Sequence, residues 1–330
     1  MKMDRRMAIG LGMAGAAALA RNARAQIAKS EPGYLPGDFT EFVPLWPGTP
    51  PGGDRVHLTL KVDTRVQPDG FHVRTISQIQ TPGYFVCRPA KPNGLALLVI
   101  PGGGYAVEGG DRGGREIAEH FTSQGITCFI LRYRLPGEGW ENRADVPLQD
   151  AQRAMRIIRE RARQYHINPA TLGAIGFSAG GHLAASLATR HAKGVYDPVD
   201  ISDALPARPF VAGLMYPVVT MGEGAHQGSR DKLLGEHPSP AAVDANSVER
   251  HVPAITVPSF ICLAADDDIV PPFPNGIALF GAMQKAKIPS ALHVFEKGGH
   301  GFSLHWAKGL PCAQWPSLFL AWAGSHGFTA

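Results

Sequence analysis

The chain has 330 residues, of which 44% are hydrophobic and 18% are charged, so it is long enough to fold around a large core. Its formal net charge is +4 at pH 7, but the first 25 residues hold five basic residues and one acidic residue, which account for this excess. The remaining chain is close to neutral, which excludes the basic footprint of a nucleic-acid-binding protein. No repeat, charge block or low-complexity linker divides residues 26–330, so we expect one α/β domain there.

The first 25 residues are typical of an export signal. Lys2 and the pair Arg5-Arg6 precede AIGLGMAGAAALA, an apolar stretch too short to span a membrane, and Ala23-Arg24-Ala25 fits a small-x-small cleavage site. The arginine pair and the Gly/Ala-rich middle resemble a twin-arginine signal, with a general secretory signal and a cytoplasmic protein as alternatives. We therefore expect a periplasmic or secreted protein with no stable membrane association once the signal is removed.

Cysteine usage and motif content argue against disulfide, metal and redox chemistry. Cys87, Cys128 and Cys262 lie in apolar, strand-like runs and are expected to be buried free thiols, whereas Cys312 is a candidate for an exposed one. Neither C-x-x-C nor H-E-x-x-H occurs. We therefore expect no metal and no cofactor.

Apolar runs and helical periodicities alternate along the chain. Strands are predicted at 56–62, 73–79, 95–100, 127–133, 172–177, 210–219, 259–265 and 291–297, and helices at 115–123, 146–165, 178–192, 277–285 and 314–323. The first two strands alternate apolar and polar residues, as half-buried antiparallel strands do. Strands separated by helices predict a mostly parallel sheet with helices on both faces. No long helical insertion precedes residue 95 or separates 135 from 148, so no large cap domain is expected.

The segment Gly176-Phe177-Ser178-Ala179-Gly180 lies between a predicted buried strand and a predicted helix. Glycines two residues before and after a serine are required where a strand turns into a crossing helix too tightly for side chains. Ser178 is therefore the candidate nucleophile. It needs a base within hydrogen-bonding reach, a group that orients this base, and donors for an oxyanion.

Candidates for the base and the acid follow Ser178 in the chain, at the carboxyl ends of predicted strands. The run SFICLAADDD ends in three consecutive acids, Asp266, Asp267 and Asp268, and the Gly-rich loop after the next strand carries His300. The rival base is His182, four residues after Ser178, but a residue at that helical position is expected to pack beneath the turn.

Two segments can supply the oxyanion donors. One is the amide of Ala179 at the start of the predicted helix, where the helix dipole also favours negative charge. The other is the turn Pro101-Gly102-Gly103-Gly104, in which the amides of Gly103 and Gly104 can face inward. Tyr105 follows directly and either lines the substrate site or is an amphipathic residue at the loop edge.

Six segments together carry a resemblance to a known group: PLWPGTPPG (44–52), VIPGGGY (99–105), PLQDAQRAMRIIR (147–159), GFSAGGHLA (176–184), ADDDIVPP (265–272) and HVFEKGGHGFSL (293–304). The chain resembles the α/β-hydrolase esterases, in particular bacterial acetylesterases and acetylxylan esterase-like proteins related to hormone-sensitive lipase. The resemblance implies a Ser-His-Asp triad. The spacing D-x-x-V-P assigns its acid to Asp267 and leaves Asp266 to brace the loop. Pro101 stands where the hormone-sensitive-lipase pattern has a histidine, so one bracing hydrogen bond is lost.

The resulting hypothesis is a serine carboxylic ester hydrolase that acts on short acyl esters. Ser178 attacks, His300 transfers the proton, Asp267 holds the imidazolium, and the amides of Gly103, Gly104 and Ala179 receive the oxyanion. By resemblance, the substrate is an acetyl ester on a carbohydrate such as xylan or its oligosaccharides. The alternatives are a general short-chain carboxylesterase or lipase, a peptidase of the same fold, and a non-catalytic binding protein that retains the fold.

Overall fold

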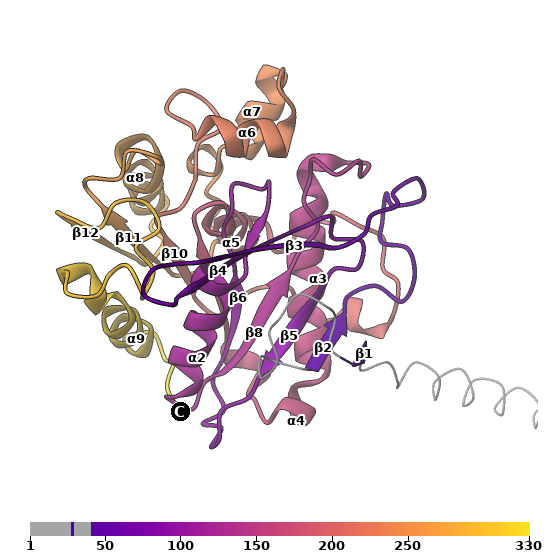
Figure 1. Ribbon diagram of the computed structural model, residues 1–330, viewed down its shortest axis with the longest axis horizontal. Coiled ribbons are helices and arrows are strands. Elements are labelled where there is room, and N and C mark those ends of the chain that lie inside the picture. The colour runs from indigo at the N-terminus through magenta and orange to yellow at the C-terminus, as the bar shows by residue number, and fades with distance from the viewer. Residues whose placement is uncertain (1–27, 30–40) are drawn as a thin grey trace, which may run out of the picture.

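The computed structural model describes residues 28–29 and 41–330 (Figure 1), so the predicted signal over 1–25 lies outside the described residues. Within this part of the chain, nine strands form one sheet in the order β1-β2-β5-β8-β6-β9-β10-β11-β12. The strands are β1 (Ala28–Lys29), β2 (Glu41–Pro44), β5 (Gly83–Cys87), β6 (Ala96–Ile100), β8 (Thr127–Arg132), β9 (Leu172–Phe177), β10 (Ala212–Met215), β11 (Ser259–Ala264) and β12 (Ser290–Phe295). Neighbours run parallel from β8 to β12 and antiparallel from β1 to β8. The predicted mostly parallel sheet is confirmed.

The centre of the sheet explains the uninterrupted apolar runs of the sequence. Every residue of β6 and of β9 is buried, because helices cover both faces of a parallel sheet. The two strands are neighbours, with Ile100 of β6 paired in register with Gly176 of β9. Their carboxyl ends therefore meet at the same edge, which is where open α/β sheets form their sites.

The helices form a layer on each face of the sheet (Figure 1). On one face lie α3 (Val146–Glu160), α5 (Ala179–Arg190) and α8 (Ala278–Lys285), and on the other lie α2 (Glu116–Thr122) and α9 (Trp315–Ser325). The predicted helix over 146–165 is divided at Arg161 into α3 and a short α4 (Ala162–Tyr165). This three-layer arrangement confirms the predicted fold class.

Two short insertions sit at the carboxyl edge of the sheet and were not predicted as such. The strand predicted at 56–62 is wrong over most of its length, because residues 56–60 form no strand and β3 covers Lys61–Val66. The strand predicted at 73–79 corresponds to β4 (His72–Ser77). It pairs antiparallel with β3, and the two form a separate small sheet with β7 (Glu108–Gly109). Most of β3 is exposed, so alternation there does not mark a face of the main core. Between β10 and β11, α6 (Gln227–Leu234) and α7 (Pro240–Asn246) lie above this edge (Figure 1). They are too short to form a large cap domain.

The four cysteines are all buried free thiols. This confirms the expectation for Cys87, Cys128 and Cys262, whereas the expectation that Cys312 could be exposed is wrong. Cys312 packs into the apolar cluster of α9, which also contains Phe302 and Trp315. Cys312 is buried because the short helical turn that carries it (Pro311–Gln314) leads directly into α9 and packs with it.

We expect the buried ion pair of Arg134 and Asp150 to be a major constraint on folding. Both side chains are fully buried, and the Asp150 carboxylate accepts hydrogen bonds from the Arg134 guanidinium, from the Arg134 amide and from Trp46 Nε1. Asp150→Ala leaves a buried, unpaired guanidinium, so the free energy of unfolding should fall by about 3–5 kcal/mol in urea denaturation.

The matched control is Asp63→Ala, which removes an ion pair with Lys61 in which both side chains are more than half exposed. This variant should lose less than about 1 kcal/mol. Equal losses in the two variants would contradict the assigned role of Asp150.

Candidate active site

Ser178 occupies the tight turn between β9 and α5, with a φ of 55° and a ψ of −120°. A Cβ on Gly176 would lie 2.1 Å from the carbonyl oxygen of Gly180, and a Cβ on Gly180 would lie 2.3 Å from that of Ile100. Side chains are therefore excluded at both positions, which explains the G-x-S-x-G spacing. Positive φ is costly for serine, and such strain persists only where the surrounding structure enforces it.

A chain of hydrogen bonds joins Ser178, His300 and Asp267. Ser178 Oγ lies 2.8 Å from His300 Nε2, and His300 Nδ1 lies 2.8 Å from Asp267 Oδ2. The other carboxylate oxygen of Asp267 accepts hydrogen bonds from the amides of Ile269 and Val270, at 3.0 and 2.8 Å. The carboxylate is thereby fixed in one orientation, and an imidazole held in this way can take the serine proton.

Asp266 lies beside this chain without joining it. Its Oδ1 accepts a hydrogen bond of 2.8 Å from the amide of Gly299, and this bond lowers the pKa of the carboxyl group. Lys297 lies 3.8 Å from the other oxygen. Of the consecutive acids, Asp267 therefore contacts His300, while Asp266 holds the loop that carries it.

His182 lies beneath the turn and not in the cleft. Its Nε2 donates to the carbonyl oxygen of Asn246 at 2.9 Å, which leaves Nδ1 to accept from the Tyr105 hydroxyl at 2.7 Å. Burial lowers the pKa of His182 to about 4, so the ring is neutral at pH 7. Tyr105 is itself buried and does not line the cleft. The structure therefore does not support its expected contact with substrate, because the ring is held beneath the glycine-rich turn.

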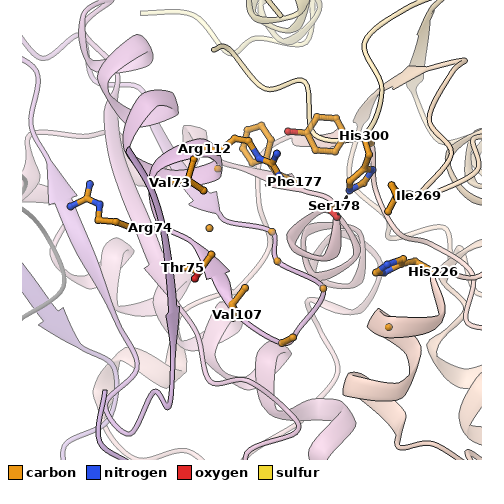
Figure 2. Close-up of a pocket in the computed structure, with 18 of the residues that line it drawn as sticks. Val73, Arg74, Thr75, Val107, Arg112, Phe177, Ser178, His226, Ile269 and His300 are labelled. Carbon is orange, nitrogen blue, oxygen red and sulfur yellow. Dashed lines mark hydrogen bonds between the residues drawn. The ribbon is translucent and has the colours of Figure 1, made fainter. Parts of the chain in front are cut away.

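The serine hydroxyl opens into a cleft of about 490 Å³ (Figure 2). Its walls come from the glycine-rich turn, the small sheet, the turn of the nucleophile, α6 and the loops after β11 and β12. The described residues that line it are Gln67, Val73, Arg74, Thr75, Gly102, Gly103, Gly104, Ala106, Val107, Gly109, Arg112, Gly113, Phe177, Ser178, Tyr216, His226, Gly228, Lys232, Ile269, His300 and Trp306. The lining thus combines apolar walls with a few polar groups near Ser178, as ligand pockets commonly do.

The glycine-rich turn passes directly over Ser178. A Cβ on Gly102 would lie 3.0 Å from Ser178 Cβ, and a Cβ on Gly103 would lie 2.1 Å from the Val107 carbonyl oxygen. Gly103 and Gly104 have φ values of 137° and 66°, and within the described chain neither amide donates a hydrogen bond. Ala179 is the first residue of α5, where an amide has no partner within the helix. These amides are available to an oxyanion.

Several lining residues were not predicted from the sequence, notably Arg112, Tyr216, His226 and Trp306. The ring of Tyr216 packs edge-on against His300, with 5.3 Å between centroids. For Arg112, the sequence offers only the glycine pair that follows it in DRGGR, which indicates a tight turn but not a place in the cleft. The other side chains come from loops whose approach to Ser178 depends on the whole sheet.

Two other kinds of functional feature are absent from the described residues. No cluster of three or more His, Cys, Asp or Glu side chains is placed to hold a metal ion there. No helix in residues 28–29 and 41–330 has the length and apolar character needed to cross a membrane.

The strand order and the serine turn define the chain as an α/β-hydrolase. Comparison with protein families then gives the particular group. The chain belongs to the BD-FAE family, whose model matches residues 86–275, more than half of the sequence.

The proteins that the chain resembles include two relatives and one solved structure. It is 30% identical over 256 residues to an acetylxylan esterase of Xylanibacter ruminicola (72% of this chain, 50% of the relative). It is 36% identical over 208 residues to endo-1,4-beta-xylanase B of Butyrivibrio fibrisolvens (63% and 32%). The chain thus spans half or less of these two proteins. The crystal structure of an acetyl ester-xyloside bifunctional hydrolase from Caldicellulosiruptor lactoaceticus superposes with a TM-score of 0.72 at 30% identity, covering 88% of this chain and 97% of that one.

The depressed pKa of His182 predicts a loss of stability in acid. In the unfolded chain the ring takes a proton near pH 6.5, whereas in the folded protein it does so near pH 4. The stabilisation is complete above pH 6.5 and is lost as the pH falls towards 4. Between pH 7 and pH 5, the wild type should lose about 2 kcal/mol more unfolding free energy than His182→Gln.

Urea denaturation at the two pH values measures this difference. The exposed His237→Gln serves as the control and should behave as the wild type does. If the wild type and His182→Gln lost the same amount, the assigned burial of a neutral ring would be wrong.

Proposed function

We propose that the protein is a serine carboxylic ester hydrolase for short acyl groups, with acetyl esters of carbohydrates such as xylan as its substrates. The observation that carries this proposal is the hydrogen-bonded chain Ser178–His300–Asp267, which opens into the cleft beneath the glycine-rich turn. Acyl transfer requires an activated nucleophile and hydrogen-bond donors for the oxyanion, and here the serine lies beside backbone amides that have no hydrogen-bond partner in the described chain.

In the first half of the reaction, Ser178 Oγ attacks the acyl carbon while His300 Nε2 takes its proton. The imidazolium is stabilised by the Asp267 carboxylate at Nδ1. The negative charge on the carbonyl oxygen is received by the amides of Gly103, Gly104 and Ala179, and the neighbouring Gly102 leaves room for it. His300 then protonates the departing alcohol, and the acyl group remains on Ser178.

In the second half, water takes the place of the alcohol. His300 removes a proton from the water as it attacks the acyl carbon, and the same amides receive the oxyanion. Collapse of this intermediate returns the proton from His300 to Ser178 and releases the carboxylic acid. These steps use only the side chains and amides described above.

The choice of an acetylated carbohydrate rests on the relatives. An acetylxylan esterase and an acetyl ester-xyloside hydrolase are both 30% identical to this chain. We also propose that the protein acts in the periplasm or outside the cell, because residues 1–25 have the features of an export signal.

Replacing the nucleophile tests the mechanism. With p-nitrophenyl acetate, Ser178→Ala should lower kcat by about 10⁴- to 10⁶-fold, because the hydroxyl that forms the acyl-enzyme is removed. The exposed Ser325→Ala is the control and should leave kcat unchanged. A fluorophosphonate probe should label the wild type and not Ser178→Ala. Full activity in Ser178→Ala would refute the mechanism.

A series of p-nitrophenyl esters from acetate to octanoate tests the acyl preference. We expect the acetate ester to have the highest kcat/KM of the series. We also expect the protein to release acetate from acetylated xylan. A higher kcat/KM for the long-chain esters would contradict the proposed carbohydrate substrate and would favour a lipid or a general ester as the substrate.

The glycine-rich turn can be tested separately. Gly103→Ala places a Cβ against the Val107 carbonyl oxygen and must shift the turn. We expect kcat to fall by about 10²–10³-fold, the usual effect of losing one oxyanion donor. Gly94→Ala is the control, since Gly94 also has positive φ (88°) but has open space around it and lies outside the cleft. Similar kcat values for the two variants would argue against an oxyanion role for the turn.

A further inference from the structure

The cleft around Ser178 carries positive charge that its own lining does not neutralise. Arg74, Arg112 and Lys232 line it, whereas none of the described lining residues is an aspartate or a glutamate. Arg74 is paired with buried Asp111, at 2.8 Å between Nε and Oδ2. Arg112 and Lys232 have no carboxylate partner within the described chain.

Arg112 is the better placed of the two cations. Its guanidinium lies 5.1 Å from the centre of the Trp306 ring, and its carbonyl oxygen accepts from the Ser303 hydroxyl, so both ends of the residue are held. Its guanidinium donates no hydrogen bond to any of the described residues. Its neighbour Arg115 differs, because it contacts both Asp111 and Glu119.

The location of Arg112 relates it to the reacting centre. Figure 2 shows Arg112 in the same cleft as Ser178, with His226 and Ile269 on the other side of the serine. Arg112 also touches the loop of His300, since a Cβ on Gly301 would lie 3.0 Å from its Cζ. A group bound by Arg112 would therefore belong to the ester whose carbonyl carbon faces Ser178.

A half-buried guanidinium whose N–H groups have no hydrogen-bond partner in the described chain favours a carboxylate as its ligand. Its planar fork matches a carboxylate with two parallel hydrogen bonds, and Trp306 already holds it in place, so little side-chain entropy is lost on binding. Apolar walls such as Val73, Val107 and Phe177 reduce competition from water.

We propose that Arg112 binds a carboxylate carried by the ester, so that the preferred substrates of this cleft are acidic esters. This inference rests on the proposed ester hydrolysis at Ser178. The carboxylate can belong to the alcohol, as in an acetylated uronic acid, or to the acyl group, as in the half-ester of a dicarboxylic acid. Arg112 recognises the same chemistry in both.

Two pairs of substrates separate these sources. Mono-p-nitrophenyl glutarate is compared with p-nitrophenyl pentanoate for the acyl side, and acetylated glucuronic acid is compared with acetylated glucose for the alcohol side. In at least one pair the wild type should prefer the acidic member. Arg112→Gln should lower kcat/KM for that member about 10- to 100-fold more than for its neutral partner.

Two further variants complete the comparison. Arg112→Lys should recover part of the preference, since it keeps the charge and loses the fork. Lys285→Gln, which removes an exposed cation on α8, should change neither member of a pair. No acidic preference in either pair, or equal losses for both members in Arg112→Gln, would overturn the proposal; equal losses would mean that Arg112 only supports the His300 loop.

A binding measurement keeps this test independent of turnover. Calorimetry with Ser178→Ala should detect glucuronate or glutarate, and the double variant Ser178→Ala/Arg112→Gln should lose that binding. Binding without any hydrolysis by the wild type would refute the proposed function and leave the carboxylate site standing. Absence of binding to Ser178→Ala would refute the site.

Discussion

The close crossing of β9, β6 and α5 is the constraint on which the site depends. Gly176 and Gly180 allow backbone atoms to approach where a methyl group would collide with a carbonyl oxygen. This crossing forces Ser178 to a positive φ and presents its hydroxyl above the edge of the sheet. The strain is carried by the packed core beneath, in which β6 and β9 are wholly buried. The reactive geometry is thus a property of the whole sheet.

The groups around the serine are held from outside the cleft. Asp267 is oriented by two backbone amides, and His300 is carried on a loop that Asp266 fastens through the Gly299 amide. On the opposite side, Tyr105 and His182 form a buried neutral pair beneath the glycine-rich turn. Such supports reduce the reorganisation that the site must undergo when charge develops in it.

The sequence predicted those parts of the structure that depend on local rules. The serine turn was readable because its glycines are required within five residues, and the central strands were readable because burial on both faces demands continuous apolar runs. Arg153 shows the limit of such rules, because a charged side chain on a helix favours the solvent, yet Arg153 is buried and paired with Asp200 and Asp203. Such partners lie far along the chain and leave no local pattern, as is also true of the residues that α6 adds to the cleft.

The small sheet of β3, β4 and β7 forms part of the substrate-facing wall of the cleft, whereas the main sheet carries the strained serine. The small sheet shares no strand with the main sheet. It is held to the body through β7, through the Arg74–Asp111 ion pair and through Ile76 of β4, which packs into the main core. Substitutions at Val73 and Thr75, which line the cleft from β4, can therefore reshape the wall that faces the substrate without disturbing the strained serine. The hairpin is a natural place for the protein to acquire new specificity, in evolution or in the laboratory, at small cost to the fold.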